Sequence, residues 1–300
     1  MGLLSNWVES LDYEYEISTS CTRYRSPRSA CTKCIISCNK QAISLVNSKP
    51  VLEKEKCVEC GNCIAACPEQ AITGIYPIRT IFQNQLFITN NNILSVKELL
   101  VFYQKGVRGI ICENPSMMEE WMQPIFDANT KLELLGEEPF HTNFSSIEIK
   151  EELYSRREIF SFWKKEGGSV LKQVTPAKWR FNQKNFDLTQ YYKDYQFTKI
   201  TVDSEKCTLC TACQNLCNKN CFEIGEDYFS ISAQKCSACN LCADTCPEQA
   251  IVVEEQISKK EETKLPILKK VCIECRNNFN TLSEHEEKCV GCKIRSRFLR

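Results

Sequence analysis

Apolar and polar positions in the middle of the chain alternate with two different periods. The pattern predicts a strand over 81–88, a helix over 95–105, a buried strand over 107–112 and a second helix over 116–135. A serine at position 95 can cap the first helix, and Gly136 provides a stop for the second. This strand–helix–strand–helix order favours a small α/β unit with parallel strands. It contains no Gly-x-Gly-x-x-Gly and no P-loop sequence, so a nucleotide fingerprint is missing.

Shorter elements are predicted on both sides of this unit. A helix is expected over 3–11 and a strand-like stretch over 13–17. Two further strands are predicted over 198–202 and 250–253, and the highly charged segment 258–264 is expected to be a linker. Pro124 predicts a kink or break in the second helix of the α/β unit.

Composition and charge exclude several classes of function. The chain has 300 residues, a formal net charge of zero and a pI near 6.7, so nothing requires a nucleic acid or an acidic membrane as partner. No apolar run reaches the length of a transmembrane helix, and the N-terminus lacks the features of a secretory signal. We therefore expect a cytoplasmic protein whose 22 cysteines stay reduced, which favours metal ligands over disulfides.

Sixteen of these cysteines fall into four blocks with related spacing. In the most regular block, three cysteines are separated by two residues each, and a fourth follows after three more and precedes a proline. Three closely spaced thiolates can hold one iron–sulfur cube, while the fourth cysteine starts a helical turn and points toward a neighbouring cube. The blocks are Cys57, Cys60, Cys63 and Cys67; Cys236, Cys239, Cys242 and Cys246; Cys207, Cys210, Cys213 and Cys217; and the stretched block Cys21, Cys31, Cys34 and Cys38.

The blocks form an internal repeat in two halves. Both halves end with the sequence Cys-Pro-Glu-Gln-Ala-Ile, at 67–72 and at 246–251. An identity over six residues indicates that a whole two-block unit is duplicated.

The blocks strongly resemble the bacterial two-[4Fe–4S] ferredoxin family, present twice over residues 21–76 and 200–253. The resemblance implies that three cysteines of one block share a cluster with the last cysteine of the other. The implied sets are Cys207, Cys210, Cys213 and Cys246; Cys236, Cys239, Cys242 and Cys217; Cys57, Cys60, Cys63 and Cys38; and Cys31, Cys34, Cys67 and Cys21.

The stretched block departs from the family pattern. Nine residues, including three arginines, separate Cys21 from Cys31, where the family has two. In one interpretation Cys21 is still a ligand and the basic loop is a docking surface or raises the cluster potential. In the other, Cys21 is free and the site holds a three-iron cluster. We favour the first.

Two of the six cysteines outside the blocks belong to no motif. Cys221 is expected to be a small residue packed against a cluster, with an extra ligand as the alternative, and Cys112 is expected to be a buried thiol.

Two C-x-x-C pairs near the C-terminus fit a tetrahedral tetrathiolate site. The spacing of Cys272, Cys275, Cys289 and Cys292 favours zinc. Rubredoxin-type iron is the alternative, although Arg276 and Lys293 stand where a rubredoxin knuckle usually carries glycine. His285 could replace one cysteine. We expect a structural site, because so short a segment has little core of its own.

The predicted fold class is α+β, with two ferredoxin-like dicluster units flanking a small α/β insert, plus a C-terminal zinc-ribbon-like module. The predicted domains are 1–76, the first dicluster domain; 77–146, the small α/β domain; 147–195, a helical and aromatic linker; 196–257, the second dicluster domain; and 265–300, the zinc-ribbon-like segment.

No arrangement of residues typical of catalysis, and no flavin or pterin motif, accompanies the cysteines. We therefore expect an electron carrier with four [4Fe–4S] clusters and one Zn²⁺, or iron in its place, and not an enzyme in its own right. By family habit its partner is a ferredoxin-type protein or a redox enzyme, such as a formate dehydrogenase-like molybdopterin oxidoreductase or a hydrogenase. The alternative is a cluster-based redox sensor or assembly factor that binds its partner through the C-terminal ribbon. Reversible electron uptake would distinguish the carrier from the sensor.

Overall fold

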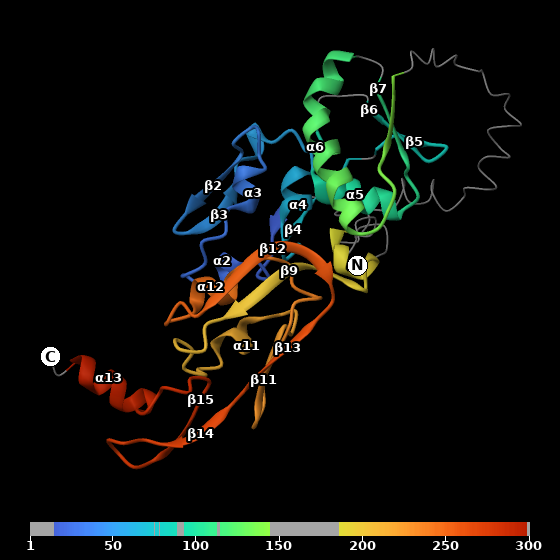
Figure 1. Ribbon diagram of the computed structural model, residues 1–300. Helices are drawn as coiled ribbons and strands as arrows, with labels where there is room; N and C mark the ends of the chain where they lie inside the picture. The colour runs from blue at the N-terminus through green and yellow to red at the C-terminus, as the bar shows by residue number, and fades with distance from the viewer. Residues whose placement is uncertain are drawn as a thin grey trace, which may run out of the picture. The chain divides into compact units, whose positions relative to one another are not determined.

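The computed structural model describes residues 15–74, 76–77, 79–88, 93–112, 115–144 and 186–298 (Figure 1). The helix predicted over 3–11 and most of the linker predicted over 147–195 lie outside these residues. The described residues form two compact units. The first comprises those within 1–21 and 33–188, and the second those within 22–32 and 189–300.

The first unit begins with a ferredoxin-like part made of small antiparallel strand pairs and short helices. Strand β1 pairs with β4, and β2 pairs with β3 in a hairpin. Its core is built from small and β-branched side chains, among them Ala42, Ile64 and Ala71, which are at most 1 % exposed. The elements are β1 (Glu16–Ile17), α3 (Lys33–Ile36), β2 (Ile43–Val46), β3 (Lys49–Leu52), the 3-10 turn η1 (Lys54–Lys56), α4 (Asn62–Ala66) and β4 (Ile72–Thr73).

A four-stranded sheet follows in the same unit, in the order β5-β6-β7-β8. Strands β6, β7 and β8 are parallel, as the predicted α/β unit requires, while β5 is antiparallel to β6. The predicted single strand 81–88 is wrong, because Gln83 and Asn84 both have positive φ (47° and 64°) and turn the segment into a hairpin. The strands are β5 (Ile81–Phe82), β6 (Gln85–Ile88), β7 (Gly109–Cys112) and β8 (His141–Phe144).

Two helices connect the parallel strands and pack against each other. This is expected because successive right-handed crossovers that run in one direction along a sheet place their helices on the same face. Helix α5 (Val96–Gln104) begins with a capping box in which Ser95 and Glu98 bond to each other's backbone N–H. Helix α6 (Pro115–Leu134) is followed by Gly136, which has a φ of 75°, and Glu137 N donates to the Leu132 carbonyl at 2.9 Å. This is a Schellman motif, so the predicted glycine stop is confirmed.

Of the kink or break predicted at Pro124, the break is wrong, because helix α6 continues through this residue. Proline removes the hydrogen bond to the carbonyl four residues earlier, which here belongs to the exposed Glu120. That carbonyl faces water and can be solvated. Trp121, Ile125 and Ala128, all at most 4 % exposed, hold the opposite face of the helix in the core on both sides of the proline.

The second unit contains three small antiparallel sheets, β9–β12, β10–β11–β13 and β14–β15. Phe229, at 0 % exposure, lies in a core that extends from the ferredoxin-like part to Ile267 and Leu282 beside the C-terminal hairpin. The elements are α2 (Thr22–Arg25), α10 (Leu188–Tyr191), β9 (Tyr195–Val202), α11 (Ala212–Leu216), β10 (Phe222–Ile224), β11 (Tyr228–Ser232), α12 (Leu241–Thr245), β12 (Ile251–Lys259), β13 (Glu262–Pro266), β14 (Leu268–Val271), β15 (Asn278–Thr281) and α13 (Val290–Phe298).

The charged segment 258–264 is part of two strands, so the linker prediction is wrong. Strand β12 extends to Lys259, and β13 begins at Glu262 and pairs with β11. The charged side chains stay exposed, while the backbone pairs in the sheets. The fully buried Gln196 fixes the turn between β12 and β13, since its side-chain Oε1 accepts from Glu261 N at 3.1 Å.

The ferredoxin-like parts of the two units each contain an equivalent backbone hydrogen bond at the repeated sequence. Ser18 N donates to the Ala71 carbonyl at 2.8 Å, and Asp203 N donates to the Ala250 carbonyl at 2.8 Å. Ala71 and Ala250 are the fifth residues of the identical hexapeptides, so the strands that follow pair in the same register in the two halves. Within the described part of the chain, no helix has both the length and the apolar character needed to cross a membrane.

Candidate metal centres

Three of the four cysteine blocks share one loop conformation. The residue before the second cysteine and the residue after it both have positive φ, between 52° and 80°. Such alternation curls the backbone so that its N–H groups and the flanking side chains face a common point. The pairs are Glu59 and Gly61, Leu209 and Thr211, and Ala238 and Asn240. In the stretched block, whose residues 21–38 are all described, no residue has positive φ, so the insertion changes the local geometry.

A five-residue helix follows each of these three loops and places the last two cysteines. In α4 the third cysteine, Cys63, lies in the only full turn, and the fourth, Cys67, is the C-terminal cap. Helices α11 and α12 repeat this arrangement. A fourth cysteine at the cap leaves its own loop, as the ferredoxin pattern requires.

Each fourth cysteine receives a hydrogen bond from the backbone four residues later. The N–H groups of Ala42, Ala71, Ala250 and Cys221 lie 3.2, 3.2, 3.3 and 3.5 Å from the respective sulfur atoms. An N–H that points at sulfur favours the thiolate, the form that binds metal. The residue that provides each bond follows a residue with positive φ, so the same tight turn recurs at all four positions.

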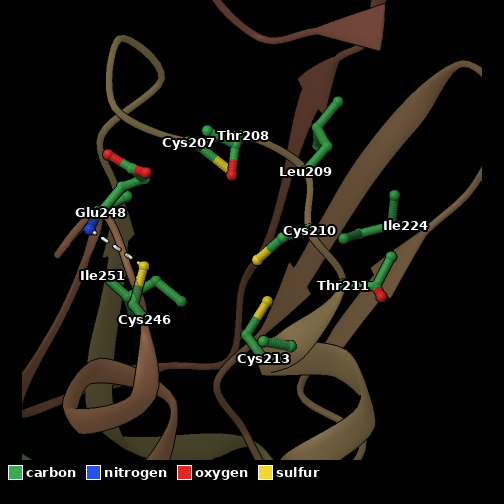
Figure 2. Close-up of a pocket in the computed structure, with 12 residues that line it drawn as sticks. Cys207, Thr208, Leu209, Cys210, Thr211, Cys213, Ile224, Cys246, Glu248 and Ile251 are labelled. Carbon is green, nitrogen blue, oxygen red and sulfur yellow. Dashed lines mark hydrogen bonds between the residues drawn. The ribbon is translucent and has the colours of Figure 1, made fainter. Parts of the chain in front are cut away.

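Cys207, Cys210, Cys213 and Cys246 line one cavity in the second unit. Figure 2 shows their four sulfur atoms pointing into the same space, three from the loop and α11 and one from the end of α12. The remaining lining is largely apolar and includes Leu209, Ile224 and Ile251. Four convergent thiols in an apolar cavity are the donor set of an iron–sulfur cluster.

A second cavity, in the first unit, is lined by Cys57, Cys60, Cys63 and Cys38. This set also combines three cysteines of one block with the last cysteine of the other. In both ferredoxin-like parts, three cysteines of one block therefore line a cavity together with the last cysteine of the other block.

The other two implied sets are described through their electrostatics. Burial raises the pKa of Cys242, and the nearby Cys236, Cys239 and Cys217 raise it further, so these four thiols lie close together. In the fourth set, Cys21 adds to the raised pKa of Cys67, which is due mainly to burial. Of this set, Cys21, Cys34 and Cys67 belong to the first unit and Cys31 to the second.

Burial is the main cause of the raised pKa of one cysteine in each cavity. It raises the pKa of Cys63 to about 12 and that of Cys213 to about 12, and neighbouring cysteines add to both shifts. Several thiolates cannot be ionised together in such a place unless a cation compensates them. Iron would supply that compensation, so the residues fit the cluster.

Cys221 lies in the core at 2 % exposure and shares hydrogen bonds with Cys217 and Cys236, which raise its pKa. Its carbonyl accepts from Ser232 N at 2.9 Å, just as the carbonyl of Ala42 accepts from Glu53 N at 2.8 Å. Cys221 thus holds the backbone position of an alanine in the repeat.

Tyr15 lines the cavity formed around Cys57, and the sequence patterns missed it. A Cβ at Gly74 would meet the Tyr15 ring at 2.5 Å, so only glycine there admits the ring. In the other half, Ile200 pairs with Val253 at the corresponding register. Comparing the two halves residue by residue would have shown an aromatic–glycine pair in place of two aliphatic side chains.

The C-terminal cysteines form the most compact group. The sulfur atoms of Cys272, Cys275, Cys289 and Cys292 all lie within 4.8 Å of one another, and His285 is not among them. Cys272 follows β14, and Cys289 and Cys292 stand at the start of α13. The backbone N–H groups of Cys275 and Cys289 lower the pKa of Cys272. This four-cysteine group could bind a metal ion.

The small sheets of this mixed α/β structure and the convergent cysteines are consistent with ferredoxin-like 4Fe-4S domains. Residues 28–72 match the family model of the 4Fe-4S dicluster domain, and residues 229–252 match that of the 4Fe-4S binding domain. No curated protein matches the chain. The matched segments include neither Cys21 nor the block from Cys207 to Cys217.

Proposed function

We propose that the chain is an electron-transfer protein with four [4Fe–4S] clusters. The observation that carries the proposal is the cavity in which Cys246 joins Cys207, Cys210 and Cys213. The ligand sets are Cys207, Cys210, Cys213 and Cys246; Cys236, Cys239, Cys242 and Cys217; Cys57, Cys60, Cys63 and Cys38; and Cys31, Cys34, Cys67 and Cys21.

The place of Cys21 in the last set is supported by its backbone. Cys21 N donates to the Ser18 carbonyl at 3.1 Å, and Cys207 N donates to the Asp203 carbonyl at 3.0 Å. Ser18 and Asp203 are equivalent in the two halves, and Cys21 follows Ser18 by three residues where Cys207 follows Asp203 by four. This nearly equivalent place after the strand supports Cys21 as the first cysteine of its block. Replacing Cys21 with alanine should change the EPR spectrum and iron content of one cluster only. Unchanged spectrum and iron content would remove Cys21 from the ligands.

The C-terminal group is proposed to hold one zinc ion as a structural site. The turn after Cys272 closes through Arg276 N, which donates to the Cys272 carbonyl at 2.9 Å, and Arg276 has a φ of 62°. Four thiolates around one ion fit zinc, and iron is the alternative.

An electron carrier requires a donor and an acceptor, and ferredoxin domains imply redox partners. A redox enzyme, such as a molybdopterin oxidoreductase or a hydrogenase, or a ferredoxin-type protein would fill this role. No catalytic constellation is proposed. We also propose the division into a first dicluster part, an α/β insert, a second dicluster part and a ribbon.

The test is anaerobic purification followed by metal analysis and EPR-monitored redox titration. The proposal expects about sixteen irons and one zinc per chain, and reversible uptake of about four electrons. Four zincs and little iron would refute it. Irreversible cluster loss on oxidation, with a change in partner affinity, would favour the sensor.

Two matched cysteine variants make the test specific. Cys210→Ser should remove between about one and four irons, because it changes one ligand of one cluster. Cys112→Ser, at a buried cysteine in β7 outside every block, should leave the iron content unchanged. Equal iron loss in both variants would show that any cysteine substitution disturbs the clusters.

A further inference from the structure

The nine residues between Cys21 and Cys31, here called the arginine loop (residues 22–30), form a folded element. Ser26 N donates to the Thr22 carbonyl at 3.0 Å, and the Ser29 hydroxyl donates to Thr22 Oγ1 at 2.9 Å. Thr22 and Ser29 are at most 4 % exposed. The loop therefore has a polar core of its own and belongs to the second compact unit.

Two arginines of this loop reach the two ferredoxin helices of the second unit. The Arg25 guanidinium donates to the Leu216 carbonyl, and Arg28 Nη1 lies 3.4 Å from the Thr245 carbonyl. Leu216 is the last residue of α11, and Thr245 is the last residue of α12. Each arginine thus takes the same position on one of two equivalent helices.

A further contact fixes the loop against α12. Ala30 N donates to Asp244 Oδ2 at 2.7 Å. Within the loop region, Arg23 Nε donates to the Cys31 carbonyl at 2.5 Å, so Arg23 makes a contact of a different kind.

The residues that follow the two helix ends are the crossing cysteines Cys217 and Cys246. A helix C-terminus carries a negative partial charge, which a cation stabilises. A guanidinium on the preceding carbonyl also lies close to the cluster that the cysteine would bind. Reduction adds one negative charge to a cluster, so a fixed positive charge nearby stabilises the reduced form.

We propose that the arginine loop tunes the second dicluster domain, with Arg25 raising the reduction potential of the Cys217 cluster and Arg28 that of the Cys246 cluster. This inference rests on the proposed function, because it requires clusters at these cysteines. It assigns two of the three arginines between Cys21 and Cys31 to the clusters of the other half of the sequence.

The test is an EPR-monitored titration of Arg25→Gln and Arg28→Gln with dithionite as reductant. Loss of one charge at about 12 Å, in an effective dielectric of about 20, changes the ratio of reduced to oxidised cluster about tenfold. For a one-electron couple this is about 59 mV toward lower potential. Each variant should lower the reduction potential of one cluster of the second domain. The potential of the other cluster should change by only a small fraction of that value.

Two control variants separate tuning from folding. Arg23→Gln removes a charge from the same loop, at a side chain whose Nε donates to the Cys31 carbonyl, and should leave both reduction potentials of the second domain unchanged. Arg25→Lys keeps the charge and should retain the wild-type potential. Unchanged potentials in both glutamine variants, or equal shifts in the Arg23→Gln control, would overturn the proposal. So would loss of the clusters in Arg25→Lys, since the arginine would then act through the fold alone.

Hydrogen exchange at the Ala30 amide reports docking of the loop independently of any cluster. Slow exchange is expected, because this amide donates to Asp244. Exchange at the rate of an unfolded peptide would overturn the proposal. If the proposed function itself is wrong, metal analysis of the wild-type protein will find no iron. That result is distinct from every outcome of the arginine variants.

Discussion

Gly61 is the position in the cluster loops where a side chain should be least tolerated. It has a φ of 80°, and a Cβ there would lie 2.7 Å from Pro77 Cδ and 2.9 Å from Tyr76 Cδ2. Tyr76 cannot easily move away, because its hydroxyl donates to the buried Glu98 and its ring lies against Phe186 at 4.9 Å. Replacing Gly61 with alanine therefore combines backbone strain with overpacking.

The magnitude follows from these two terms. A non-glycine residue in the left-handed region costs about 1–2 kcal/mol, and overpacking costs about 1–3 kcal/mol. Gly61→Ala should thus destabilise the first unit by about 2–5 kcal/mol. For a unit of this size, each kcal/mol lowers the melting temperature by about 2–4 °C, so a decrease of about 4–20 °C is expected.

The assay is anaerobic thermal unfolding followed through the cluster absorbance. Asn240 holds the equivalent position in the second unit with a φ of 58°, and asparagine tolerates this region. Gly61→Asn therefore tests which term dominates, and Asn240→Ala is the matched control at an exposed residue. If Gly61→Asn melts within about 2 °C of the wild type, the contacts with Tyr76 and Pro77 do not exclude a side chain, and the steric argument is refuted.

Three further predictions concern the metal sites and the buried polar network. Cys275→Ser should abolish zinc binding while the iron content stays the same, and metal analysis that finds zinc retained would exclude this site. Cys221→Ala should leave the iron content and EPR spectra intact, because its N–H and carbonyl keep their roles, and iron loss would make Cys221 a ligand. Glu98→Ala should lower the stability of the first unit by about 3–5 kcal/mol, because the fully buried carboxylate pairs with Arg79 at 3.4 Å and bonds with Ser95. A melting temperature within 2–4 °C of wild type, about 1 kcal/mol, would contradict it.

Sequence spacing together with the family resemblance was sufficient to predict which cysteines approach one another in the clearest cases. The spacing of Cys207, Cys210 and Cys213 limits how the loop can fold, and the resemblance to dicluster ferredoxins implied Cys246 as the fourth member. The capped helix after Ser95 was equally predictable, since its signals are local.

Features that depend on tertiary contacts were not predictable in the same way. The charged residues of 258–264 indicated a linker, because charge predicts exposure and does not report backbone pairing with β11. Pro124 indicated a kink or break, and the local sequence does not report that the residues around it would be held in the core, which keeps α6 continuous. The arginine loop gave no sign in the sequence that its contacts belong to the second unit.

The two ferredoxin-like parts repeat the same backbone but pack it differently. Where Ile200 and Val253 pair across strands in the second half, the first half has Tyr15 against Gly74. The strands pair in the same register in both halves, but of the two cavities only the first has a phenol ring in its wall. The second half instead receives two guanidinium groups from the loop, at the ends of α11 and α12. Duplication thus supplies equivalent ligand positions, and the residues around them make the electrostatic surroundings of the clusters unequal.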